Sequence, residues 1–246
     1  MENGFIYFIL IAIITLFGSY IQGVTGFGFG IFSMMFLPSI LMYTEANVLS
    51  SMLSSMSSLI SALLTFRKIH FKNLCFPVLG CLISTYFAVS FIKAQSSKTL
   101  TLLLGIALFV LSIYFFFFTN KIKIKPTWYA GLIAGVISGI MGGMFAIGGP
   151  PVVIYFIQSE EDSDHYLATI SSYFVFSGII QILIKANAGF ITASVLWAFA
   201  VGIVCMLVGS FIGKLTRDKT DPKKIKKVVY GVMAVSGIIN IVTSLI

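Results

Sequence analysis

The chain has 246 residues, of which 58% are hydrophobic and 10% are charged, and its mean hydropathy is +1.03. Soluble domains carry about a quarter charged residues. The composition therefore excludes a soluble core and predicts an all-α polytopic membrane protein that has the lipid bilayer as a partner. The net charge of +8 falls mostly in short loops without interleaved aromatic residues, which excludes nucleic acid as a partner and suggests that these charges orient the chain in the bilayer.

The first apolar tract runs from Gly4 to Tyr43, about 40 residues. As one helix it would be about 60 Å long, roughly twice the thickness of the hydrocarbon core. It must therefore turn back, and the glycine cluster Gly23–Gly30 (GVTGFGFG) marks the turn. No basic region or small-residue cleavage site accompanies its start, so we expect this tract to remain in the mature protein. Three candidates for spanning helices follow: Ala46–Phe66, Leu74–Ile92 and Thr99–Thr119.

The same order then recurs in the second half. The tract Trp128–Gln158 is broken at Gly142–Pro151 (GGMFAIGGPP), because glycines and two prolines cannot continue a helix. We interpret the chain as a single membrane domain, 1–246, with a first repeat (1–120), a cytoplasmic linker (121–127) and a second repeat (128–246). Three further candidates for spanning helices complete the second repeat: Tyr166–Ile184, Ile191–Gly213 and Ile225–Ile246.

The basic loops predict the topology. The loops at 67–72, 121–125 and 214–227 carry most of the lysine and arginine, so all three should be cytoplasmic. These three loops lie on the same side of the membrane only if each broken tract is a re-entrant hairpin, which leaves the membrane on the side from which it entered. Each half then crosses three times, the two repeats are inverted, and both termini lie outside. The acidic segment at 160–164 would also be cytoplasmic, which is acceptable because acidic residues count little in this rule.

Two inverted hairpins would point free helix N-termini at one place near the bilayer midplane. Unpaired N–H groups and the helix dipole make such a place suitable for an anion. Small hydroxyls on the following helices could complete the set of hydrogen bonds to the anion's oxygens. Any single hydroxyl could instead bond only to backbone or allow close packing. The candidate substrate-binding residues are Gly23, Thr25, Gly26, Gly28, Gly30, Asn47, Ser50, Ser51, Gly142, Gly143, Gly148, Gly149, Pro150, Thr169, Ser171 and Ser172.

Other polar or small residues have simpler interpretations. The series Gly131, Gly135 and Gly139 has the four-residue spacing of close helix packing. Lys185 is interpreted as a snorkelling side chain at a helix end, and Glu45 as a solvated loop acid, with a part in proton coupling as the alternative. His70 and His165 are expected at the surface of loops. The sequence has no catalytic motif, and neither a metal nor a cofactor is expected.

The motif from Gly23 (GVTGFGFG), the motif from Gly139 (GIMGGMFAIGGPPVVIYF) and the two-half layout resemble the TauE/SafE family of sulfite and sulfonate exporters and permeases. The resemblance covers the whole chain in architecture. It implies transport of small anions, often sulfur-containing, such as sulfite, sulfoacetate, taurine or thiosulfate. It also implies a bacterial-type plasma membrane and roles for the glycines of both motifs and for Pro150 and Pro151.

The resulting hypothesis is a secondary transporter for a small anion, such as a sulfur oxyanion or an organosulfonate. The anion would bind between the two hairpin tips, with alternating access by one repeat moving against the other, and with H⁺ or Na⁺ as a possible coupling ion. The alternatives are an anion channel with the same hairpins and a membrane scaffold in which the breaks only serve packing. An intramembrane enzyme is disfavoured because the sequence lacks paired intramembrane acids and bases.

Overall fold

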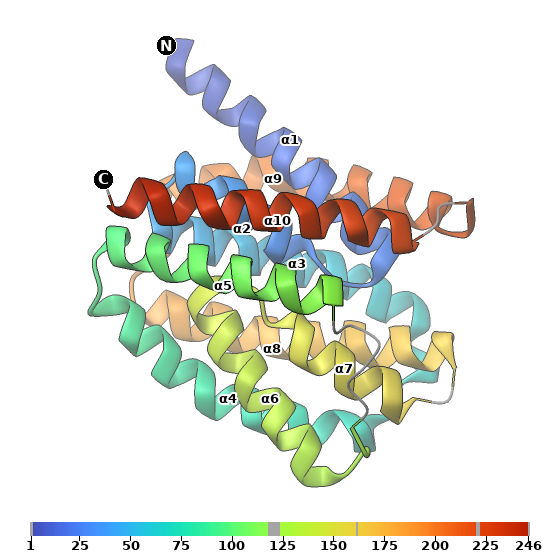
Figure 1. The fold of residues 1–246 in the computed structure, drawn as a ribbon. Helices are drawn as coiled ribbons and strands as arrows, with labels where there is room; N and C mark the ends of the chain where they lie inside the picture. Colours follow the sequence, from blue (N-terminus) through green and yellow to red (C-terminus); the bar gives the residue numbers. More distant parts are fainter. Residues whose placement is uncertain (1, 118–123, 161, 220–221, 246) are drawn as a thin grey trace.

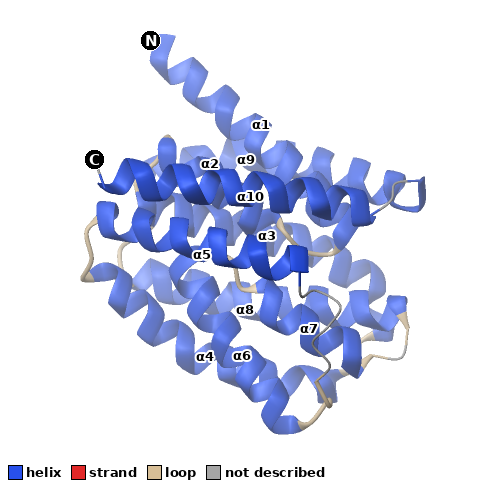
Figure 2. Cartoon of the chain, viewed as in Figure 1, coloured by secondary structure: helices blue, strands red, loops and turns tan. Residues whose placement is uncertain are grey.

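The computed structural model describes residues 2–117, 124–160, 162–219 and 222–245, and within them the regular structure is entirely helical (Figures 1 and 2). The α-helices are α1 (Glu2–Thr25), α2 (Phe29–Phe36), α3 (Tyr43–Thr65), α4 (Phe71–Lys93), α5 (Ser97–Phe117), α6 (Trp128–Phe145), α7 (Gly149–Ser159), α8 (Ser163–Asn187), α9 (Ala193–Thr216) and α10 (Pro222–Leu245). Short 3₁₀ helices follow three of them: η1 (Leu37–Ser39), η2 (Phe66–Lys68) and η3 (Arg217–Lys219).

Eight helices of the described chain are long and apolar enough to cross a membrane, four from each half: α1, α3, α4 and α5, then α6, α8, α9 and α10. The predicted spanning helices are all present, although residues 118–119, part of the 121–127 linker and Ile246 lie outside the described residues. Helices α2 and α7, of 8 and 11 residues, are too short to span about 30 Å of hydrocarbon. Each broken tract is thus a helix of spanning length joined to a short one, and whether it returns to its own side stays a prediction.

Both interruptions fall inside the glycine-rich stretches that were predicted to hold them. The first break, residues 26–28, contains Gly26 and Gly28 at φ values of +82° and +110°, a region that L-residues rarely adopt. The second break, residues 146–148, turns at Ala146 with φ of +55°. Pro150 then lies in the first turn of α7, where its missing N–H would have had no partner within the helix.

The two halves pack mainly against each other. Helix α4 packs along α6 and α9 along α1, while α3 lies against α8 and α5 against α10. If α1–α5 are matched in order to α6–α10, each of these contacts has its counterpart in the other half. A Cβ on Gly135 would lie 2.1 Å from the Pro77 carbonyl oxygen, and one on Gly139 would lie 2.7 Å from that of Cys81. The packing role predicted for these glycines is therefore confirmed.

The connections that carry basic residues gather at one end of the bundle. Lys68 forms an ion pair with Asp164, and the backbone N–H of Ile124 donates to the Gln158 side chain at the end of α7. Asp164 also lines a surface groove with Lys214 and Arg217. The acidic 160–164 segment thus shares an end with the basic loops and is partly paired with them, and both chain termini lie toward the other end (Figure 1).

Candidate functional site

The two breaks meet in the interior of the molecule. A Cβ on Gly30, in the first turn of α2, would lie 1.9 Å from the carbonyl oxygen of Ala146 in the second break. A Cβ on Gly149, the first residue of α7, would lie 3.2 Å from the ring of Phe27 in the first break. The N-terminal ends of α2 and α7 are therefore neighbours, and close contact between the breaks requires glycine on both sides.

A small cavity of about 40 Å³ lies where the breaks meet. This volume admits roughly three water-sized groups. Its walls combine backbone with neutral polar side chains and a few apolar ones. The two breaks and the helix starts after them contribute Phe27, Gly28, Gly30, Ile31 and residues 146–149. Helices α1, α3 and α8 contribute the polar side chains of Gln22, Ser51, Ser54, Ser55, Ser177 and Gln181.

The electrostatics at this cavity come first from the two helix starts. The N-cap residues are Gly28 for α2 and Gly148 for α7, and neither helix has a side-chain cap. Because a helix N-terminus carries a partial positive charge, two uncapped starts against one cavity favour an anion there. Hydroxyl and amide side chains of the walls can add hydrogen bonds to oxyanion oxygens.

A buried lysine lies directly behind the cavity wall. The Lys185 side chain is fully buried, so the expectation that it snorkels is wrong. Its Nζ donates to Ser51 Oγ at 2.7 Å, to Gln181 Oε1 at 3.2 Å and to the Gly142 carbonyl at 3.2 Å. Ser51 and Gln181 line the cavity, so a single layer of side chains separates the Lys185 amino group from it.

The predicted site residues divide into three groups. Five line the cavity: Gly28, Gly30, Ser51, Gly148 and Gly149. Others support the breaks around it. The Thr25 hydroxyl donates to the Ile21 carbonyl, Gly26 makes the first turn, and the Gly142 carbonyl accepts from Lys185. Asn47 Nδ2 donates to the Gly143 and Met144 carbonyls, and Ser50 bonds to Ser33.

The third group lies away from the cavity. Gly23 packs against α9 and Gly143 against Ala88 of α4. Pro150 borders an apolar surface groove, and Ser171 lines the groove at the basic end. The Thr169 hydroxyl accepts from the His70 backbone N–H, and the Ser172 hydroxyl donates within its own helix to Ala168.

Several polar residues beside the cavity were not among the predicted ones. Ser177, Gln181 and Lys185 recur every four residues on α8, and Ser54, Ser55 and Ser58 on α3 have helical spacing with the predicted Ser51. Such a polar stripe on an otherwise apolar helix was the signal that could have identified this wall. The interpretation of Glu45 as a solvated acid is also wrong, because Glu45 is buried and accepts from the Thr192 hydroxyl at 2.6 Å.

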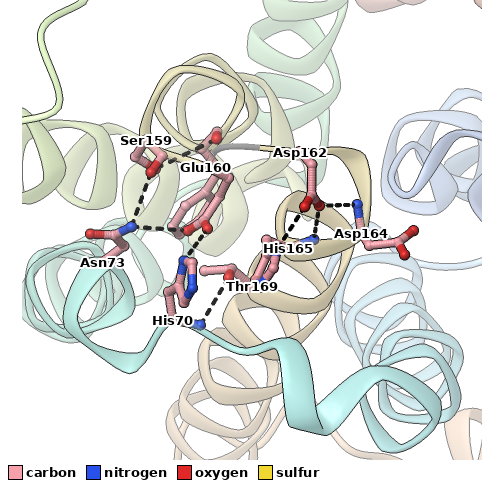
Figure 3. A network of polar contacts seen from close by, with 9 residues as sticks. His70, Asn73, Ser159, Glu160, Asp162, Asp164, His165 and Thr169 are labelled. Carbon is pink, nitrogen blue, oxygen red and sulfur yellow. Dashed lines mark hydrogen bonds and ion pairs between the residues drawn. The ribbon is translucent and has the colours of Figure 1, made fainter.

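A second polar network joins the end of α7 to the start of α4 (Figure 3). His70 Nδ1 lies 2.6 Å from Glu160 Oε2, and Asn73 donates to Glu160 Oε1 at 3.1 Å. The rings of His70 and His165 stack with centroids 4.5 Å apart. Asp162 caps α8, and hydrogen bonds from the His165 backbone N–H and side chain lower the pKa of Asp162 to about 2.

Comparison with known proteins identifies the family. The sulfite exporter TauE/SafE family matches residues 10–239. The chain belongs to this family. It is therefore a multi-pass integral membrane protein of a transporter family and not an enzyme. A TauE/SafE relative from Cupriavidus necator, described as a probable sulfite/organosulfonate exporter TauE, is 22% identical over 225 residues, which cover 88% of this chain and 86% of the relative. No solved structure gives a significant match.

Proposed function

We propose that this chain is a secondary transporter of a small anion, either a sulfur oxyanion or an organosulfonate, in a bacterial-type plasma membrane. The anion would bind in the cavity between the two breaks. The observation that carries this proposal is the convergence of two uncapped helix starts and a buried lysine on one small polar cavity. Helix N-termini and ammonium groups both stabilise negative charge.

The substrate class rests on the relative's description and on the size of the cavity. A space for roughly three water-sized groups suits the head of a sulfite or sulfonate and not a large organic anion. The oxygens of a tetrahedral sulfonate or a pyramidal sulfite could accept hydrogen bonds from backbone N–H groups at the start of α2 and from the hydroxyls of Ser51, Ser54 and Ser55. An organic tail would need an opening that forms during the transport cycle.

The transport cycle we infer is alternating access between inverted repeats. The packing of α4 on α6 corresponds to the packing of α9 on α1, so each half contacts the other through equivalent helices. This equivalence supports an alternating-access cycle. Movement of one broken tract against the other would separate Gly30 from Ala146 and open the cavity toward one side. Discontinuous helices with binding at their junction are the usual arrangement for such transporters.

Flux in proteoliposomes tests the site. We expect Gly149→Val to abolish uptake of radiolabelled sulfite, because a side chain at Gly149 would press against the Phe27 ring at the cavity. Gly148→Val should behave similarly, since its Cβ would lie 2.9 Å from the Ser138 carbonyl oxygen. Gly231→Ala is the matched control, because nothing lies within 4 Å of a Cβ there. Wild-type flux in the correctly inserted Gly149 variant would refute the site.

The same preparation separates a transporter from a channel or a scaffold. A transporter shows saturation and counterflow, whereas a channel shows neither. A thermal-shift screen with sulfite, sulfate, thiosulfate, taurine, sulfoacetate and simple carboxylates identifies ligands, because an anion that binds only the folded state raises its apparent stability. A scaffold predicts no shift with any of them.

A further inference from the structure

Lys185 has an unusual set of partners for a buried cation. Its three hydrogen-bond acceptors, on α3, α6 and α8, are all neutral, and the ion pairs found among the described residues do not include it. Helix α4 contributes the titratable Cys81 thiol near it. The carboxylate on α3, Glu45, bonds instead to Thr192 at the start of α9.

This environment makes the charge of Lys185 depend on what occupies the cavity. A buried ammonium without a counter-ion is strongly disfavoured, whereas an anion nearby favours the charged form. Ser51 and Gln181 each touch both the ammonium and the cavity. An anion in the cavity would therefore lie one side chain away from Nζ, close enough for the two charges to interact strongly in a medium of low dielectric constant.

We propose that Lys185 binds a proton when an anion enters the cavity and releases it when the anion leaves, so that the chain moves a proton together with each anion. The proton adds to the neutral amine from water that reaches the cavity and returns to water on the other side. No covalent bond to the substrate is involved. This proposal rests on the proposed function, because it needs an anion in that cavity.

Two consequences follow from linkage. Anion binding and protonation of Lys185 strengthen each other by the same factor, so anion affinity should fall as pH rises. A monoanion bound with one added proton leaves the net charge of the site unchanged. The loaded and the empty carrier would then carry the same charge, and transport of a monoanion would be electroneutral.

Calorimetry on the purified wild-type protein tests the proposal directly. Methanesulfonate is a suitable probe because it stays a monoanion from mildly acidic to mildly alkaline solution and so carries no titrating proton of its own. Titrations in two mildly alkaline buffers with different ionisation enthalpies give the number of protons bound. We expect uptake of about one proton for each anion. Binding with no proton uptake would overturn the proposal and leave the anion site intact.

Variants of Lys185 separate charge from proton transfer. Arginine stays protonated in proteins, so Lys185→Arg should still bind methanesulfonate but without proton uptake. Lys185→Met should weaken anion binding by at least about tenfold. The matched control is Lys93→Met, since Lys93 is exposed at the end of α4, and it should change neither quantity. If Lys185→Arg does not fold, the wild-type calorimetry decides alone.

The outcomes distinguish the two proposals. If methanesulfonate, sulfite and sulfoacetate all fail to bind the folded wild-type protein, the proposed function fails and the proton coupling fails with it. If they bind and Lys185→Met binds as tightly as the wild type, only the role of Lys185 fails. Flux into vesicles that contain a pH-sensitive dye gives a second check, because internal acidification must accompany methanesulfonate entry in the wild type and be absent in Lys185→Arg.

Discussion

The two breaks occupy corresponding places in the two halves but are held by different means. The first break turns at two glycines, and Thr25 bonds to the Ile21 carbonyl within its own tract. The second break turns at Ala146, whose N–H bonds to the Gly142 carbonyl as in an αL cap, while the Ile147 N–H bonds to the Met141 carbonyl. Side chains from other helices bind the carbonyls just before it: Asn47 donates to those of Gly143 and Met144, and Lys185 to that of Gly142. The first break is thus stabilised locally and the second by tertiary contacts.

The helix starts after the breaks differ as well. The first turn of α2, Phe29 to Ile31, keeps every backbone N–H, whereas α7 begins Gly149-Pro150-Pro151 and loses two donors to proline. The first break can therefore offer more hydrogen bonds to an anion, and the second offers a more rigid frame. Two halves with the same order of helices can therefore differ in role, the first break binding the anion and the second supporting the site.

The largest effect should come from closing the contact between the breaks. In Gly30→Ala the added Cβ would lie 1.9 Å from the Ala146 carbonyl oxygen, and backbone atoms cannot move aside as a side chain can. We expect a loss of about 3 kcal/mol or more in unfolding free energy, at the upper end for overpacking, together with loss of flux. Thermal unfolding in detergent and proteoliposome flux measure these two effects.

The control for this prediction is Gly231→Ala, because Gly231 lies within α10 with open space around it. Alanine there should stabilise the helix by up to about 1 kcal/mol. If Gly30→Ala behaves like this control, the two breaks are not in contact, and the comparison between them loses its basis.

The next effect separates local from tertiary support. Asn47→Leu removes the donor to the Gly143 and Met144 carbonyls. The Tyr43 hydroxyl still donates to Met144, so the Gly143 carbonyl loses its side-chain donor, at a cost of about 1–3 kcal/mol. Thr25→Val removes a hydroxyl whose contacts, with the Ile21 and Phe27 carbonyls and the Phe27 N–H, all lie within its own tract, at about 1 kcal/mol. We expect the Asn47 variant to unfold at the lower temperature. Equal melting temperatures would mean that the second break does not depend on α3.

A smaller effect concerns the turn residues themselves. Gly28 has φ of +110°, outside the left-handed helical region that alanine can enter, so Gly28→Ala should cost about 1–3 kcal/mol. Ala146 at φ +55° lies inside that region. Ala146→Gly relieves about 1 kcal/mol of strain but loses a similar amount of chain entropy, so its stability should change little. Chemical denaturation followed by tryptophan fluorescence measures both, and a large gain in Ala146→Gly would show stored strain at the second break.

Local signals in the sequence predicted the helices and both breaks, because apolar runs of spanning length and clusters of glycine and proline act within a few residues. The burial of Lys185 was missed for the opposite reason. Ser51 and Gly142, which enclose its ammonium, lie far from it in sequence, and its place near the end of an apolar run suggested snorkelling. Glu45 was misread in the same way, because its partner Thr192 belongs to the other half.

The smallest effect concerns the far end of the second tract, where Asp162 caps α8 beside the α7 terminus. Its folded-state pKa is lowered to about 2, below the ordinary value of about 4. The stabilisation from its carboxylate is therefore present above about pH 4 and lost as the pH falls toward 2. Asp162→Asn keeps a good cap without the titration, so acid should lower its melting temperature less than that of the wild type.

The first tract ends in the 3₁₀ turn Leu37–Ser39, which has no titratable side chain. Protection factors, which correct hydrogen exchange for its intrinsic pH dependence, should therefore fall in acid near residue 163 and stay constant near residue 37. Parallel changes at both places would show that the two tracts are anchored alike.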